Sequence, residues 1–159
     1  MDEQRAWDDA SAWMGTLADL DAASAVLEGD RETIMPPGAA EGRGSQLATL
    51  AALRHRHLLD PAVGDALARI TESDDPWRAA SGRLAMRERT RAARVPEDLV
   101  RALTEASSRG VATWAEARPA VDVGAWVDAV APLMALTRQQ AEALADGGDP
   151  YDEIGRAHV

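Results

Sequence analysis

Hydrophobic residues recur every three or four positions along most of the chain, which is the spacing of an amphipathic α-helix. Alternation of apolar and polar residues with a period of two, which is typical of a strand, is almost absent. The first stripe predicts a helix over about residues 4–28 that ends at Gly29, and it consists of Trp7, Ala10, Met14, Leu17, Leu20 or Asp21, Ser24 and Leu27. The pattern predicts an all-α fold.

Consecutive prolines interrupt the chain after this helix. Pro36 and Pro37 lack amide donors and disfavour helical geometry in the residue that precedes them. We therefore expect an irregular connection over residues 33–38, followed by a second helix that runs to Leu59. The apolar side of that helix carries Leu47, Leu50, Ala51 and Leu58.

Acidic residues next to prolines mark the next helix starts. Asp60-Pro61 and Asp75-Pro76 each offer an N-cap followed by a first-turn proline. They predict a third helix as far as Ile70 and a fourth as far as about Arg94.

Two further helices complete the prediction. Pro96 begins a fifth helix, whose apolar stripe is Leu99, Leu103, Ala106, Val111, Trp114 and Ala117. Asp122 caps a sixth helix, which Pro132 is expected to bend or restart and Gly147-Gly148 to end. About six helices are expected in all, and a chain of 159 residues is long enough to bury one ordinary core.

The charge balance argues against a general nucleic-acid binder. The chain has 17 basic and 27 acidic residues, so its net charge is 17 − 27 = −10. Binding to a polyanion needs a cluster of basic side chains, and only residues 78–101 run basic. We expect no nucleic-acid partner.

Cysteine and long apolar segments are both missing from the sequence. The lack of cysteine excludes disulfides, thiolate metal sites and thiol catalysis. No stretch approaches the roughly 18 apolar residues of a membrane span, and residues 1–5 do not resemble a secretion signal. We expect a cytoplasmic chain with no membrane partner.

The histidines do not form a recognisable metal site. A zinc peptidase helix carries HExxH, with two histidines four residues apart on one face, and that motif is absent from the sequence. His55 and His57 are two apart and lie on opposite sides of a helix, so we expect them to be surface or half-buried residues, with a ligand contact of either one as the alternative. The glycines Gly38, Gly42 and Gly44 do not have P-loop spacing, and the chain contains no lysine.

Other candidate clusters have structural explanations. Arg83, Arg87 and Arg91 share one helix face, joined by Arg89 and Arg94, and we expect this face to be solvated, with an anion contact as the alternative. The five tryptophans are expected in the core, with a groove-lining role for one of them as the alternative: Trp7, Trp13, Trp77, Trp114 and Trp126. The carboxylate pairs are expected to act as caps and first-turn charges rather than as a catalytic dyad, namely Asp8-Asp9 and Asp74-Asp75.

The connection between the first two helices carries a family resemblance. Residues 30–48 resemble the segment D-x-E-T-x-M-P-P-G-x-A-E-x-R-G-x-Q-L-A near the start of the carboxypeptidase Taq family of metallocarboxypeptidases. Later landmarks follow in the same order: residues 94–100 resemble R-x-P-x-x-L-V, residues 114–118 resemble W-x-E-A-R, and Pro132-Leu133 and residues 150–152 resemble P-x-L and P-Y-D. The resemblance spans about residues 20–152.

Two positions depart from the family pattern. Gly29 stands where the family usually has tryptophan, which puts one packing contact in doubt. The acidic and aromatic helix that follows P-Y-D in the family is replaced by residues 153–159.

The resemblance implies a cytoplasmic, homodimeric, mostly helical enzyme that removes C-terminal residues from peptides. Such an enzyme uses one zinc or cobalt ion held by HExxH and a downstream glutamate, in the C-terminal half of the family's chains. The present helices would form one wall or lid of the peptide groove, as the N-terminal part of a larger helical metallopeptidase fold. No catalytic or metal-binding role is therefore transferred to any residue here, and no substrate-binding residue is assigned. We expect this chain alone to bind no metal and to be inactive.

The last residues suggest a boundary. Residues 154–159, among them His158, match the translation of ATC GGA AGA GCA CAC GTC, which resembles a common sequencing adapter. We therefore interpret residues 1–152 as the N-terminal helical region of a metallocarboxypeptidase and residues 153–159 as a non-native tail. A genuine polar tail is the alternative reading of these residues. For the whole chain, the alternative is a free-standing acidic helical module that binds another protein.

Overall fold

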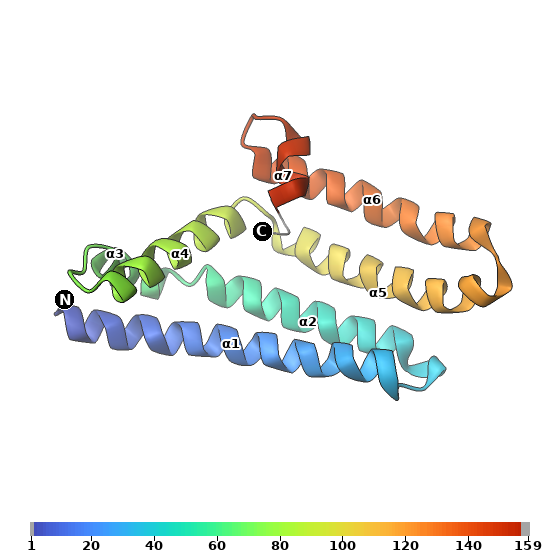
Figure 1. The fold of residues 1–159 in the computed structure, drawn as a ribbon, viewed down its shortest axis with the longest axis horizontal. Coiled ribbons are helices and arrows are strands. Elements are labelled where there is room, and N and C mark those ends of the chain that lie inside the picture. The colour runs from blue at the N-terminus through green and yellow to red at the C-terminus, as the bar shows by residue number, and fades with distance from the viewer. Residues whose placement is uncertain (1, 157–159) are drawn as a thin grey trace. The chain divides into compact units, whose positions relative to one another are not determined.

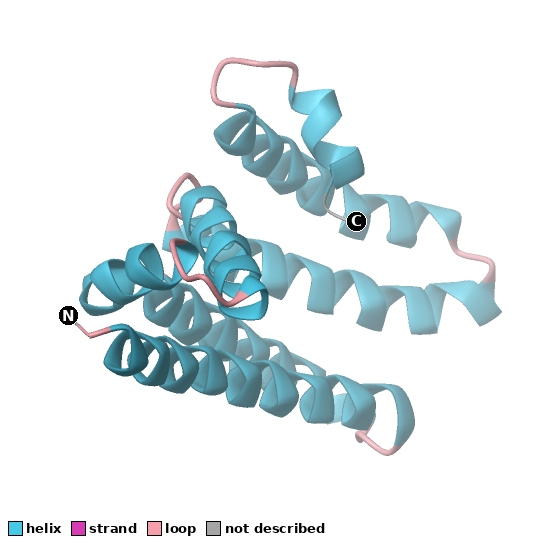
Figure 2. Ribbon diagram, turned by 60° about the vertical axis from the view of Figure 1, so that its left-hand side comes forward, coloured by secondary structure: helices cyan, strands magenta, loops and turns pink. Residues whose placement is uncertain are grey.

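The computed structural model describes residues 2–156 and consists of helices joined by short loops (Figure 1). No strand occurs among these residues (Figure 2). The α-helices are α1 (Glu3–Thr33), α2 (Ala40–Leu58), α3 (Gly64–Thr71), α4 (Pro76–Ala92), α5 (Glu97–Ala120), α6 (Val123–Ala145) and α7 (Pro150–Arg156), with 3₁₀ turns at η1 (Pro37–Ala39) and η2 (Pro61–Val63). The all-α prediction is confirmed, and α7 is added to the six expected helices.

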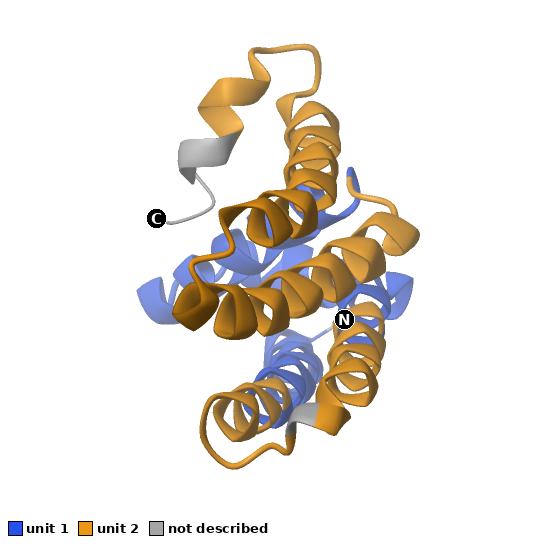
Figure 3. Ribbon diagram, turned by 90° about the vertical axis from the view of Figure 1, so that its right-hand side faces the viewer, with its two compact units in different colours: residues 1–23, 53–94 blue, residues 24–52, 95–159 orange. Residues whose placement is uncertain are grey.

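The described chain divides into two compact units (Figure 3). The first unit comprises residues 1–23 and 53–94, and the second comprises residues 24–52 and 95–159. Helices α1 and α2 each contribute one part to each unit.

A small hydrophobic core holds the first unit together. Four residues of α1 at three- and four-residue spacing lie buried in it, namely Ala6, Ala10, Trp13 and Leu17. Leu67 and Ile70 of α3 are the largest side chains that are completely buried, so each removes its whole apolar surface from water. The indole Nε1 of Trp13 donates to the carbonyl of His57 at 2.8 Å, which satisfies the one polar atom of that ring.

Arginines join helices around this core. The guanidinium of Arg54 donates to Asp21 at 2.6 Å and to Glu88 at 2.8 Å. Burial lowers the pKa of Arg54, but the hydrogen bonds and the charges of the two carboxylates outweigh burial, so the pKa is raised overall. Arg89 donates to the carbonyls of Leu58 and Asp60 at 2.5 and 2.8 Å, and so satisfies backbone acceptors at the end of α2.

The second unit is built on the antiparallel pair α5 and α6 (Figure 1). The turn between them places Val121 in the left-handed region, with φ 54° and ψ 31°. Asp122 follows as the N-cap of α6 and accepts from the amide of Ala125 at 3.0 Å, as the sequence predicts. Ala106 and Ala117 of α5 and Ala141 of α6 are buried.

Four helix-start signals were predicted correctly, Asp122 among them, and the predicted stop at Gly29 was wrong. Asp60 and Asp75 cap the segments that follow them, and α5 begins after Pro96. Gly29 does not end α1, because an exposed glycine weakens a helix by only about 1 kcal/mol and the hydroxyl of Thr33 bonds the carbonyl of Gly29 at 2.7 Å. Of the two outcomes expected at Pro132, a restart does not occur, because α6 is one helix from Val123 to Ala145.

The tryptophans differ most from expectation. Trp13 is in the core, but Trp77, Trp114 and Trp126 are exposed to 73%, 44% and 37%. The apolar stripe of α5 is likewise only partly covered, since Val111 is exposed. Periodicity identifies an apolar face but not whether another element covers it. His55 is more buried than predicted, with 8% of its surface exposed.

Two glycines of this chain are expected to respond oppositely to alanine. A Cβ at Gly82 would lie 2.8 Å from the backbone nitrogen of Thr71, whereas a Cβ at Gly29 would meet nothing within 4 Å. Gly82→Ala should therefore destabilise the chain by about 1–3 kcal/mol through overpacking, and Gly29→Ala should stabilise it by about 0.5–1 kcal/mol. Urea unfolding followed by circular dichroism measures both, and a stabilising Gly82→Ala would contradict the contact between α3 and α4.

Val121 is expected to carry backbone strain. A β-branched residue rarely adopts positive φ, and 80% of the surface of Val121 is exposed, so little packing compensates. Val121→Asn should raise the free energy of unfolding by about 1 kcal/mol. Val127→Asn, at an exposed helical position, is the matched control and should give no gain. Equal effects of the two variants would refute strain at Val121.

Candidate functional site

Residues 30–48 form the end of α1, the turn η1 and the first half of α2. Asp30 and Arg43 form an ion pair across this turn, and both side chains are largely shielded from solvent. Arg43 also donates to the carbonyl of Leu27 at 3.1 Å and to Oε1 of Gln46 at 3.0 Å. One planar guanidinium thus joins the two helices, a task that suits arginine better than lysine.

A glycine in the same segment allows two helices to approach closely. A Cβ at Gly44 of α2 would lie 3.2 Å from Cβ of Ser108 on α5, and Ser108 is itself buried. The hydroxyl of Ser108 accepts a hydrogen bond from Nη1 of Arg31 at 3.4 Å. Residues 30–44 therefore hold α1 and α2 together as a helical hairpin that also contacts α5. We call this segment the helix-hairpin clamp.

Two of the later landmarks lie at helix starts, whereas residues 114–118 lie within α5 and Pro132-Leu133 within α6. Pro96 has extended geometry before α5, and Val95 and Leu99 on either side of it are buried. Pro150 is the first residue of α7, where the amide of Tyr151 donates to Asp149 Oδ1 at 2.9 Å.

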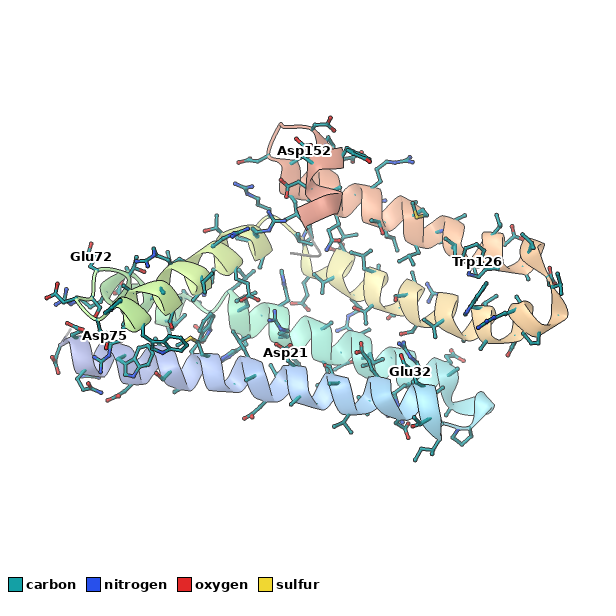
Figure 4. The ribbon with its side chains drawn as sticks, viewed as in Figure 1. Asp21, Glu32, Glu72, Asp75, Trp126 and Asp152 are labelled. Carbon is teal, nitrogen blue, oxygen red and sulfur yellow. The ribbon has the colours of Figure 1, made fainter. Side chains whose placement is uncertain are left out.

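An aromatic cluster lies near the turn between α5 and α6. Trp114 and Trp126 approach with ring centroids 5.4 Å apart, and the guanidinium carbon of Arg118 lies 5.7 Å from the Trp114 ring centroid. Figure 4 shows Trp126 beside α5 near the start of α6. These three residues, with Val121 and Val123, line a mostly apolar cavity of about 200 Å³.

The residues that the sequence offered for metal or anion binding do not come together in one site in the described part of the chain. No group of three or more histidine, aspartate or glutamate side chains that could hold a metal ion occurs in the described part of the chain. His57 stacks on Trp13, and its Nε2 lies 3.1 Å from the carbonyl oxygen of Trp13. Arg83 and Arg87 are exposed, in agreement with a solvated face, whereas Arg91 is partly buried.

The carboxylate pairs have separate local contacts. Asp75 caps α4 by accepting from the amides of Trp77 and Arg78, as predicted. Asp8 accepts from the side chain of Gln4 within α1. No paired carboxylate geometry suited to catalysis follows from these contacts.

Comparison with known proteins decides the family. The model of the carboxypeptidase Taq (M32) metallopeptidases matches residues 10–156. The chain belongs to this family. The resemblance found in residues 30–48 and in the later landmarks is therefore confirmed, and the helix-hairpin clamp is a structural part of an M32 chain.

Individual relatives agree with the assignment. Thermostable carboxypeptidase 1 of Thermus thermophilus is 31% identical over 97% of this chain and 32% of its own length. The crystal structure of an M32 carboxypeptidase from Deinococcus radiodurans is 33% identical, with a TM-score of 0.70 over 94% of this chain and 30% of that one. A carboxypeptidase structure from Pyrococcus furiosus, 22% identical, shares the fold with a TM-score of 0.69 over 92% of this chain and 30% of that one. The chain spans about a third of the length of these relatives.

Among residues 2–156, none of the helices is both long enough and apolar enough to cross a bilayer.

The clamp predicts a stability effect specific to guanidinium. Arg43→Lys keeps the charge but cannot reproduce all three contacts of Arg43, so the free energy of unfolding should fall by about 1–2 kcal/mol. Arg109→Lys is the control, because Arg109 is 67% exposed and lies 3.9 Å from Glu105; its effect should stay within about 0.5 kcal/mol. Equal losses for the two variants in urea unfolding would show that Arg43 is not a clamp.

Proposed function

We propose that this chain is the N-terminal portion of a metal-dependent carboxypeptidase that hydrolyses C-terminal residues from peptides. The observation that carries the proposal is the match of the M32 family model to residues 10–156, supported by the similar fold of the M32 carboxypeptidase from Deinococcus radiodurans. The helices would form one wall of the peptide groove. The full-length enzyme would be a cytoplasmic homodimer.

The described residues do not fit the metal of such an enzyme. Zinc or cobalt, held by HExxH and a downstream glutamate in a further part of the protein, would activate a water molecule and polarise the scissile carbonyl. HExxH does not occur in the 159 residues, and His55 is enclosed among helices. The role of this chain in the enzyme is therefore to shape the groove, and no metal-dependent step is assigned to its side chains.

The aromatic cluster supports a second candidate function, that of a protein-binding module. Exposed apolar side chains near the α5–α6 turn, among them Trp114, Trp126 and Val121, also suit an acidic helical module that binds another protein. A module should unfold in one sharp transition as a monomer or defined oligomer, whereas a separated part of an enzyme should aggregate and unfold with low cooperativity.

The proposal predicts activity only in a longer protein. Sequencing the source DNA downstream of the Asp152 codon should reveal an open frame that reaches an HExxH helix. The protein expressed from that frame should release C-terminal residues from a blocked dipeptide with zinc or cobalt, and a chelator should abolish the release. The 159-residue chain, assayed in parallel, should show no release.

Two outcomes would contradict this proposal. Metal-dependent peptidase activity of the 159-residue chain would show that the catalytic residues lie within it. A stop codon directly after Val159 in the source DNA would favour the binding module instead.

A further inference from the structure

A cavity of about 310 Å³ lies within the second unit, between the end of α1, the middle of α2, and helices α5 and α6. Its volume is at the lower end of the roughly 300–1,000 Å³ that is typical of small-ligand pockets. The lining combines one acidic and one basic side chain with three leucines and several hydroxyl groups. This mixture differs from the mostly apolar cavity beside Trp114 and Trp126.

Arg31 supplies the basic group of this cavity and is poorly satisfied by the protein. Its Nη1 reaches only the hydroxyl of Ser108, at 3.4 Å, and its buried Nε has no hydrogen-bond partner among the described residues. By contrast, Arg43 and Arg54 each contact carboxylates. A guanidinium with free donors in a partly buried position is suited to a carboxylate, which it can bind through two parallel hydrogen bonds.

Glu28 supplies the acidic group. It lies three residues before Arg31 in α1, so the two side chains share one face of the helix. Within the described part of the chain, no ion pair joins them. The exposed carboxylate of Glu28 and the partly buried guanidinium of Arg31 therefore line the same cavity without forming an ion pair with each other.

The remaining lining is apolar on one side. Leu47 of α2 is buried, and Leu103 of α5 and Leu133 of α6 are partly buried. Together they offer an aliphatic surface to a ligand whose charged end reaches Arg31. A zwitterion with an aliphatic side chain matches all three parts of the lining, whereas an inorganic anion would match only Arg31.

We propose that this cavity binds a free α-amino acid with an aliphatic side chain. The α-carboxylate of the ligand accepts from Arg31, its α-ammonium donates to Glu28, and its side chain packs against Leu47, Leu103 and Leu133. The inference depends on the lining of the cavity and not on peptidase activity, so the two can fail separately.

The first test compares ligands by isothermal titration calorimetry on the unaltered chain, using the non-aggregated helical fraction isolated by gel filtration. L-leucine should bind saturably at one site. Leucinamide lacks the carboxylate and 4-methylpentanoate lacks the ammonium, so each should bind at least about tenfold more weakly. Sulfate that binds as well as L-leucine would reduce the site to a simple anion contact, and no saturation by L-leucine at 50 mM would overturn the proposal.

Variants assign the two charged ends. Arg31→Gln should weaken L-leucine binding at least about tenfold, while Arg87→Gln, at an exposed position outside the cavity, should leave it unchanged. Glu28→Gln should bring L-leucine and 4-methylpentanoate to similar affinities, because the group that distinguishes them is lost. A merely structural role of Glu28 would weaken both ligands equally and would overturn its assignment to the ammonium.

Discussion

Close approach of helix backbones over alanine and glycine is the constraint on which both units depend. More than half of the buried hydrophobic residues in the described part of the chain are alanines, and the sequence contains no phenylalanine. Gly82 against Thr71 in the first unit and Gly44 against Ser108 in the second leave no room for a Cβ without movement of a neighbour. A small side chain buries little apolar area by itself. These contacts therefore stabilise the fold only because the helix backbones approach closely enough to pack against each other.

Arginine side chains add polar contacts between helices to the packing of the small residues. Arg54 and Arg89 connect helices of the first unit, and Arg43 connects α1 to α2 in the second. In each case the guanidinium reaches at least two acceptors at once, which a lysine could not do with the same geometry. Three of the acidic residues serve as partners of these arginines, namely Asp21, Asp30 and Glu88.

The family motif at residues 30–48 and the candidate ligand site share residues, since Arg31 and Leu47 line the cavity. Three of the M32 landmarks lie at helix starts or in the helix-hairpin clamp, where they support the local fold, and the other two lie within α5 and α6. The cavity at Arg31 adjoins the clamp. Ser108 lines the cavity, packs against α2 at Gly44 and accepts a hydrogen bond from Arg31. A change in the clamp would therefore also alter the side of the cavity that Ser108 forms.

The sequence by itself determined the helical class, most helix boundaries and the family. These depend on local signals, such as the Asp75-Pro76 cap and the spacing of residues 30–48, which act within a few residues of each other. It misjudged Gly29, because a glycine lowers helix stability without ending a helix, and it placed Trp114 and Trp126 in a core where they are exposed. Only the tertiary structure decided which apolar faces are covered and brought Glu28, Arg31 and Leu133 to one cavity. The physical reason is that hydrophobic periodicity specifies the face of a helix, whereas the partner of that face is set by packing between segments far apart in the chain.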